Sequence, residues 1–148
     1  MITTINKDIL TVDKGVIVHF CNCLGAMGGL AGAIASKWPI VKESYLKYLK
    51  EKESNVFAIG GIDIVRVEKP LWVINAFTQY DFGSGRRTEY SAVINALEKV
   101  RREAISLDIY LPYMVGCGLG GGDWSIVQKI IEKTFENYGG NVYICKHE

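Results

Sequence analysis

Two hydrophobic periods follow one another along the chain, and each change of period marks a predicted boundary between strand and helix. Apolar runs predict strands at 2–5, 15–21, 56–59, 62–67, 71–77, 109–115 and 141–146. Helical spacing predicts helices over 30–38, after Pro39, from Glu89, and between Gly122 and Gly139. Pro112 lacks the N–H that a central strand donates, so we expect it at a bulge or near a sheet edge. Strands interleaved with helices predict a layered α/β domain with a largely parallel or mixed sheet.

Length and composition indicate one ordinary domain spanning 1–148. Of its 148 residues, 49% are hydrophobic and 22% are charged, which suffices for a real core. The net charge of +1 lacks the excess of positive charge that a nucleic-acid backbone requires, so no strong nucleic-acid binding is expected. No apolar run approaches the roughly 20 residues that span a bilayer, and no signal-peptide pattern is present. Four cysteines (Cys21, Cys23, Cys117 and Cys145) fit reduced thiols, and we expect a cytoplasmic location without a membrane partner.

Segment 19–29 joins a predicted buried strand to a predicted helix through a glycine-rich turn. The unpaired N–H groups and the positive dipole end of a helix start favour a bound anion such as phosphate. Gly25, Gly28 and Gly29 have no Cβ, so a ligand can approach the backbone closely. Asn22 adds a donor and acceptors at the end of the strand. The segment therefore predicts a ligand loop.

Segment 116–122 is a second glycine-rich turn in an equivalent position. It satisfies G-x-G-x-x-G through Gly116, Gly118 and Gly121, but that fingerprint opens the first βα unit of a dinucleotide-binding fold. Here a single predicted strand follows the helix, which disfavours a Rossmann dehydrogenase. Two such loops beyond the carboxyl ends of strands predict a cradle for a diphosphate. The alternative is that these glycines serve only as turn residues and helix caps.

Three motifs lie in register over nearly the whole chain: 6–9 (NKDI), 19–29 (HFCNCLGAMGG) and 115–119 (VGCGL), the last followed by Trp124. Together they resemble the macro domain family of ADP-ribose-binding modules. Within this family the chain is most similar to the yeast-type ADP-ribose 1″-phosphate phosphatase. The resemblance implies a three-layer α/β/α sandwich around a mixed, largely parallel sheet and an ADP-ribose derivative as ligand. No cofactor is expected.

The resemblance also implies roles for individual residues. Asp8 would bind the adenine amino group, Ile9 would add a backbone contact, and Asn22 would hydrogen-bond the distal ribose. The other residues implied to contact the ligand, mostly at its phosphates, are Gly28, Gly29, Leu30, Gly116, Cys117, Gly118, Leu119 and Gly120.

Two departures from a related class bear on the chemistry. In the terminal ADP-ribose–protein glycohydrolases, a lysine follows the threonine at a strand end, and an acid lies in the second loop. Here Gln79 follows Thr78, and the loop position is Gly120. A lysyl–ribose intermediate therefore cannot form at this site. The yeast-type phosphatase also lacks that lysine, so the departures favour a phosphatase.

His19 is the only histidine outside the C-terminal tail, and it precedes Asn22 on the predicted strand. A neutral imidazole there would serve as a general acid or base, so His19 and Asn22 are the candidate catalytic residues. The alternative is a core histidine with its hydrogen bonds satisfied. His19, Cys21 and Cys23 fall short of the usual zinc pattern, which needs a second ligand pair, and no metal is expected.

Four charged residues near the loops have two interpretations each. Asp123 would either activate water or, as we favour, cap the last helix. Asp81, Arg86 and Arg87 would either contact a terminal phosphate or form a solvated charged loop.

The sequence leaves three functional hypotheses. The first is a phosphoric monoester hydrolase that removes the 1″-phosphate of ADP-ribose 1″-phosphate. The second is a de-ADP-ribosylating hydrolase that uses a ribose-activated water in place of lysine. The third is a reader that only binds ADP-ribose. We expect a monomer whose partners are a small ADP-ribose derivative and, under the second hypothesis, ADP-ribosylated macromolecules.

Overall fold

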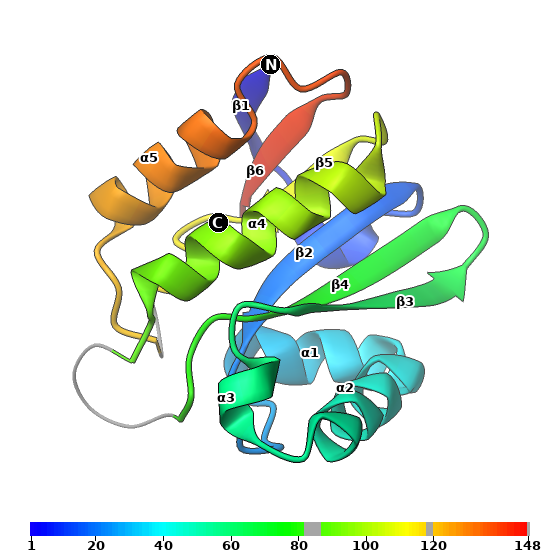
Figure 1. The fold of residues 1–148 in the computed structure, drawn as a ribbon. Helices are drawn as coiled ribbons and strands as arrows, with labels where there is room; N and C mark the ends of the chain where they lie inside the picture. The colour runs from blue at the N-terminus through cyan, green and yellow to red at the C-terminus, as the bar shows by residue number, and fades with distance from the viewer. Residues whose placement is uncertain (82–86, 118–119, 148) are drawn as a thin grey trace.

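The computed structural model describes residues 1–81, 87–117 and 120–147. At its centre lies a six-stranded sheet in the order β1-β6-β5-β2-β4-β3 (Figure 1). Every neighbouring pair is parallel except β3 with β4. The strands are β1 (Ile2–Asn6), β2 (Gly15–Cys21), β3 (Ile62–Glu68), β4 (Leu71–Phe77), β5 (Ile109–Pro112) and β6 (Val142–Lys146). The helices are η1 (Ile9–Thr11), α1 (Gly29–Lys37), α2 (Pro39–Lys52), α3 (Asn55–Ala58), α4 (Tyr90–Ala104) and α5 (Trp124–Thr134).

Helices cover both faces of the sheet (Figure 1). Alternation along β2 explains how, because successive side chains of a strand point to opposite faces. Val16 and Val18 belong to the core cluster that includes most of the buried residues of α4 and the two buried residues of α5. Ile17 belongs to the cluster that contains Ile34 of α1 and Val41 of α2. The predicted three-layer α/β/α sandwich with a largely parallel sheet is confirmed. In the described ranges, no helix has the length and apolar character needed to cross a membrane.

The strand predicted at 56–59 is wrong, because Asn55–Ala58 forms the short helix α3. Ser54 caps this helix, and its side chain accepts a hydrogen bond from the Val56 N–H at 3.3 Å. The apolar run is not a buried strand: Phe57 is 71% exposed, whereas Ala58 is buried. Periodicity cannot separate a strand from one helical turn in so short a run.

The strand predicted at 109–115 is shorter than expected and ends at Pro112. Pro112 lies neither at a bulge nor at a sheet edge, since β5 is an inner strand between β6 and β2. The pairing of β5 with β2 ends at Tyr110, before Pro112. The N–H that proline lacks is therefore not needed for a hydrogen bond to β2. The last helix also ends early, at Thr134, whose carbonyl accepts a hydrogen bond from Arg101 at 2.7 Å.

Candidate functional site

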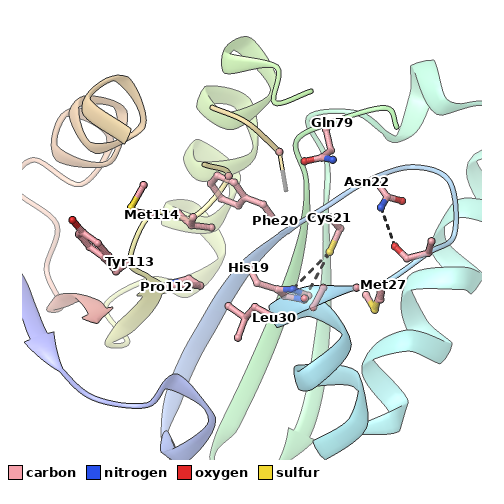
Figure 2. Close-up of a pocket in the computed structure, with 17 residues that line it drawn as sticks. His19, Phe20, Cys21, Asn22, Met27, Leu30, Gln79, Pro112, Tyr113 and Met114 are labelled. Carbon is pink, nitrogen blue, oxygen red and sulfur yellow. Dashed lines mark hydrogen bonds between the residues drawn. The ribbon is translucent and has the colours of Figure 1, made fainter. Parts of the chain in front are cut away.

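A cleft of about 820 Å³ opens at the carboxyl edge of the sheet, where β2 and β5 end (Figure 2). These strands are paired only near their amino ends, through two residue pairs that stop at Tyr110. Beyond that point Phe20 and Pro112 line the opening. In open α/β sheets, ligands bind beyond the carboxyl ends of the strands, and this cleft lies there. The predicted site residues that line it are His19, Asn22, Gly28, Gly29, Leu30, Gly116 and Gly120.

The first loop is held in shape by Asn22 and by Tyr45 of α2. The Asn22 Oδ1 accepts from the Leu24 N–H at 2.9 Å, and its Nδ2 donates to the Ala26 carbonyl at 2.9 Å. The Tyr45 hydroxyl donates toward the Asn22 Oδ1 at 2.8 Å and accepts from the Gly25 N–H at 3.0 Å. Asn22 therefore organises the loop in addition to lining the cleft.

The loop continues into the N-terminus of α1, as predicted. Gly28 is the N-cap residue and Gly29 opens the helix with a φ of 54°, a conformation that favours glycine. A Cβ added at Gly28 would meet nothing within 4 Å. The first N–H groups of a helix have no intrahelical partner, so this end of α1 can receive an anion.

The second loop is packed tightly against its neighbours. Gly116 has a φ of 77°, and a Cβ there would lie 2.9 Å from the Phe20 ring. A Cβ at Gly120 would overlap Thr88 Oγ1 and would lie 2.7 Å from the Gly116 carbonyl. Thr88 Oγ1 donates to that same carbonyl at 2.7 Å and so anchors the loop. Gly118 and Leu119, also predicted to contact the ligand, lie outside the described residues.

Three predicted ligand residues do not line the cleft. Asp8 is the N-cap of η1, and its Oδ1 accepts from the Leu10 N–H at 3.0 Å. Ile9 is buried in the core beneath α1. The Cys117 thiol contacts the Val115 carbonyl oxygen at 3.5 Å, and burial raises its pKa to about 11.

His19 lies at the floor of the cleft and is 2% exposed. Its Nε2 is 2.5 Å from Asn75 Oδ1. Both polar hydrogens of the Asn75 amide are used, because Nδ2 donates to the Val41 carbonyl at 3.2 Å and to Asp63 Oδ2 at 3.1 Å. The Asn75 oxygen must therefore accept, and His19 is the tautomer that carries its proton on Nε2.

Burial lowers the pKa of His19 to about 4, although the bond to Asn75 opposes the shift. The imidazole is therefore neutral at pH 7, with a pKa well below the ordinary value of a histidine. The physical reason is desolvation, which penalises the charged form inside the protein.

Several residues of the cleft escaped the sequence analysis. Tyr113 and Met114 form an apolar side just after β5, and Gln79 lies toward Asn22 on the other side (Figure 2). Thr88, buried beneath the second loop, was also missed. Of these residues, the sequence pointed only to Gln79, because it stands where the related glycohydrolase class has a lysine.

The charged residues near the loops have ordinary structural roles. Asp123 is the N-cap of α5, as favoured, and its hydrogen bonds from the Ser125 side chain and backbone lower its pKa. Arg87 pairs with Asp81 at 3.5 Å, whereas Arg86 lies outside the described residues. In the part of the chain that the structure describes, no three histidine, cysteine or acidic side chains converge as metal ligands.

The fold and the cleft define a three-layer α/β/α domain with two glycine loops at one ligand site. No protein-family model and no curated protein matches the sequence. Among solved structures, a macrodomain protein from Streptomyces coelicolor is 30% identical with a TM-score of 0.83 and 100% coverage of both chains. The macrodomain of Mycobacterium tuberculosis DarG is 25% identical with a TM-score of 0.80 and 99% coverage of both chains.

A more distant structure, Thermosipho africanus DarTG in complex with ADP-ribose, is 21% identical with a TM-score of 0.70. It is matched over 88% of this chain and 38% of that chain, and the likeness shows the shared fold. Full-length similarity to the Streptomyces protein places the chain in a family: it belongs to the macrodomains.

Proposed function

We propose that the cleft binds ADP-ribose, with the adenosine on the Tyr113 side and the distal ribose toward Gln79 and Asn22. The observation that carries this proposal is that both glycine loops border one cleft, which offers aromatic surface on one side and amide groups on the other. Such a gradient suits a ligand with a nucleobase, a central diphosphate and a terminal sugar. The similarity to Thermosipho africanus DarTG, whose structure is a complex with ADP-ribose, supports the choice of ligand.

The adenine amino group is assigned to Asp8, although this residue lies outside the cleft proper. Asp8 follows β1, which lies on the same side of β2 as β5 and Tyr113. Its Oδ1 is used by the cap of η1, whereas Oδ2 lies 3.9 Å from His147 Nε2. Oδ2 is therefore the oxygen assigned to accept from the adenine.

The proposed reaction is hydrolysis of the 1″-phosphate of ADP-ribose 1″-phosphate, as in the yeast-type phosphatase. Gln79 occupies the position at which the glycohydrolase class has its lysine, and a side chain at Gly120 would overlap Thr88 and the Gly116 carbonyl. Chemistry through a lysine and an acid at these positions is thereby disfavoured. Direct attack of water on phosphorus needs neither group.

The catalytic roles are assigned to groups around the first loop. The N–H groups of Gly28 and Gly29 at the start of α1 would stabilise the charge on the phosphate. Asn22 would hold the distal ribose. His19 is neutral and donates through Nε2, so its Nδ1, which lies 3.9 Å from Cys21 Sγ, is the ring atom left to take the proton of the attacking water. The phosphate–oxygen bond then breaks, and the ribose oxygen leaves with a proton from solvent.

The test compares turnover of ADP-ribose 1″-phosphate and of ADP-ribosylated protein in parallel. We expect release of inorganic phosphate from the first substrate, insensitivity to EDTA, and a fall in kcat of roughly 10²–10⁴ in His19→Ala, the usual effect of losing a general base. Turnover of the ADP-ribosylated protein alone would identify a de-ADP-ribosylating hydrolase. Tight ADP-ribose binding with neither turnover would identify a reader.

A further inference from the structure

Gln79 places a polar atom in the cleft that the mechanism above leaves unused. The residue lies just beyond β4, is 7% exposed, and lines the cleft (Figure 2). Its Nε2 donates to the Asp81 carbonyl at 2.7 Å. This bond identifies the nitrogen end of the amide, so Oε1 is the end that can only accept.

The surroundings of Gln79 fix the direction of this oxygen. Its backbone forms a β-bridge with Thr88, and the Thr88 N–H donates to the Gly120 carbonyl at 3.0 Å. The next residue, Tyr80, accepts from the Cys23 N–H at 3.1 Å, which ties the segment to the first loop. Gln79 is therefore held between the two glycine loops.

Within this frame Oε1 lies against the second loop. It is 2.8 Å from the position that a Cβ on Gly120 would occupy, so the glycine backbone is what lets the two approach. Among the residues that the structure describes, no N–H or O–H group donates to Oε1. The Gln79 side chain lines the cleft, so a bound ligand or water can supply the donor that this acceptor lacks.

The chemistry of an acceptor narrows what can face it. A phosphate oxygen would be repelled by Oε1, because both atoms carry negative charge. A hydroxyl group would donate to it. The site at Gln79 thus suits the sugar of a sugar diphosphate and disfavours the phosphates themselves.

We propose that Gln79 is a specificity-determining residue: its Oε1 accepts a hydrogen bond from a hydroxyl group of the distal sugar and selects ligands that carry this sugar. The inference rests on the proposed function, because only a ligand with its adenosine at Tyr113 brings a sugar to Gln79. It makes Gln79 a recognition group in its own right, beyond replacing a lysine.

The test compares the affinities of ADP-ribose and of the β-methyl ester of ADP, which carries the same two phosphate charges but no distal sugar. Isothermal titration calorimetry should show that Gln79→Leu lowers the affinity for ADP-ribose about tenfold, which is the effect of one lost hydrogen bond. The affinity for the ester should change about twofold at most. Gln79→Glu keeps an acceptor oxygen at this position and should retain the wild-type ratio of the two affinities.

Tyr113→Ala at the adenosine side is the matched control, and it should weaken both ligands equally and leave the ratio unchanged. If Gln79→Leu does not fold, Gln79→Asn withdraws the acceptor by one methylene and should lower the ratio in the same direction. An unchanged ratio in a folded Gln79 variant overturns the inference while the proposed function stands. Failure of the wild-type protein to bind ADP-ribose would instead overturn the proposed function.

Discussion

Burial decides the charge of His19, the residue that the proposed mechanism uses as a base. Its ring lies 2% exposed in a chain of hydrogen bonds that continues through Asn75 to Asp63 and then to Ser44, whose Oγ donates to Asp63 at 3.0 Å. Asn75 accepts the hydrogen bond from the Nε2–H of the neutral ring. Desolvation lowers the pKa of His19 to about 4. A histidine with a depressed pKa in the folded state must affect stability in acid, because the unfolded chain binds its proton more readily.

The sign of this effect gives the first prediction. Between pH 6.5 and 4 the unfolded state holds more protons on His19 than the folded state does. The stability that the folded protein has from its neutral His19 is therefore complete above pH 6.5 and is lost as the pH falls. At pH 5 the loss is about 2 kcal/mol relative to pH 7.5. His19→Gln should remove this part of the acid destabilisation, measured as the difference in urea unfolding free energy between the two pH values. Equal pH dependence in both proteins would contradict the buried neutral histidine.

At the scale of elements, helix α2 supports the first loop through one hydroxyl. Tyr45 is fully buried and stacks on Phe77 with ring centroids 5.6 Å apart. Burial raises the pKa of Tyr45, so its hydroxyl stays protonated and can donate to Asn22 while it accepts from Gly25. The shape of a ligand loop thus depends on a residue about twenty positions away in the sequence.

Tyr45→Phe should therefore weaken both the fold and the site. Removing the hydroxyl takes the acceptor from the partly buried Gly25 N–H and one donor from Asn22 Oδ1, and we expect a loss of about 1–3 kcal/mol in unfolding free energy. Affinity for ADP-ribose should fall with it, as measured by calorimetry at a temperature where the variant is folded.

Tyr48→Phe is the control for this prediction. Tyr48 stacks on the same Phe77 ring, with centroids 4.5 Å apart, but its hydroxyl does not bond the first loop within the described ranges. This variant should keep the wild-type affinity. Equal losses in both variants would show that aromatic packing, and not the hydroxyl, supports the loop.

At the scale of the whole molecule, the cleft joins two parts of the chain that have separate cores. The first loop and α1 pack with α2 on one face, whereas the loop after β5 belongs to the layer of α4 and α5. A ligand that contacts both sides binds the folded protein and does not bind the unfolded chain. Binding should therefore raise the unfolding temperature of the whole domain.

ADP-ribose at 100 times its dissociation constant should stabilise the fold by about 2.7 kcal/mol, or roughly 5–10 °C in Tm for a domain of this size. AMP at the same concentration should give a much smaller shift, because it lacks the diphosphate and the distal sugar that reach the other side. Differential scanning fluorimetry with both ligands provides the measurement. Equal shifts would mean that the adenosine side alone carries the binding.

Local patterns allowed much of the fold to be predicted. β2 and β4 have the predicted boundaries, because each is a buried apolar run bounded by glycine, proline or polar residues. The strand prediction at 56–59 was wrong because so short an apolar run does not show which residues are buried, and burial is what separates a strand from a helical turn. The predicted position of Pro112 was wrong because the sheet accommodates a proline where the pairing with β2 has ended, and the sequence does not show that point.

The sequence by itself determined the α/β class, the two glycine loops and the family resemblance, since each depends on the order and spacing of nearby residues. The tertiary structure alone decided the charge of His19, the support of Asn22 by Tyr45 and the approach of Gln79 to Gly120. These contacts join residues from about 20 to more than 50 positions apart. Burial and hydrogen-bond direction arise only when such segments pack together, and they set the chemistry that each group in the cleft can perform.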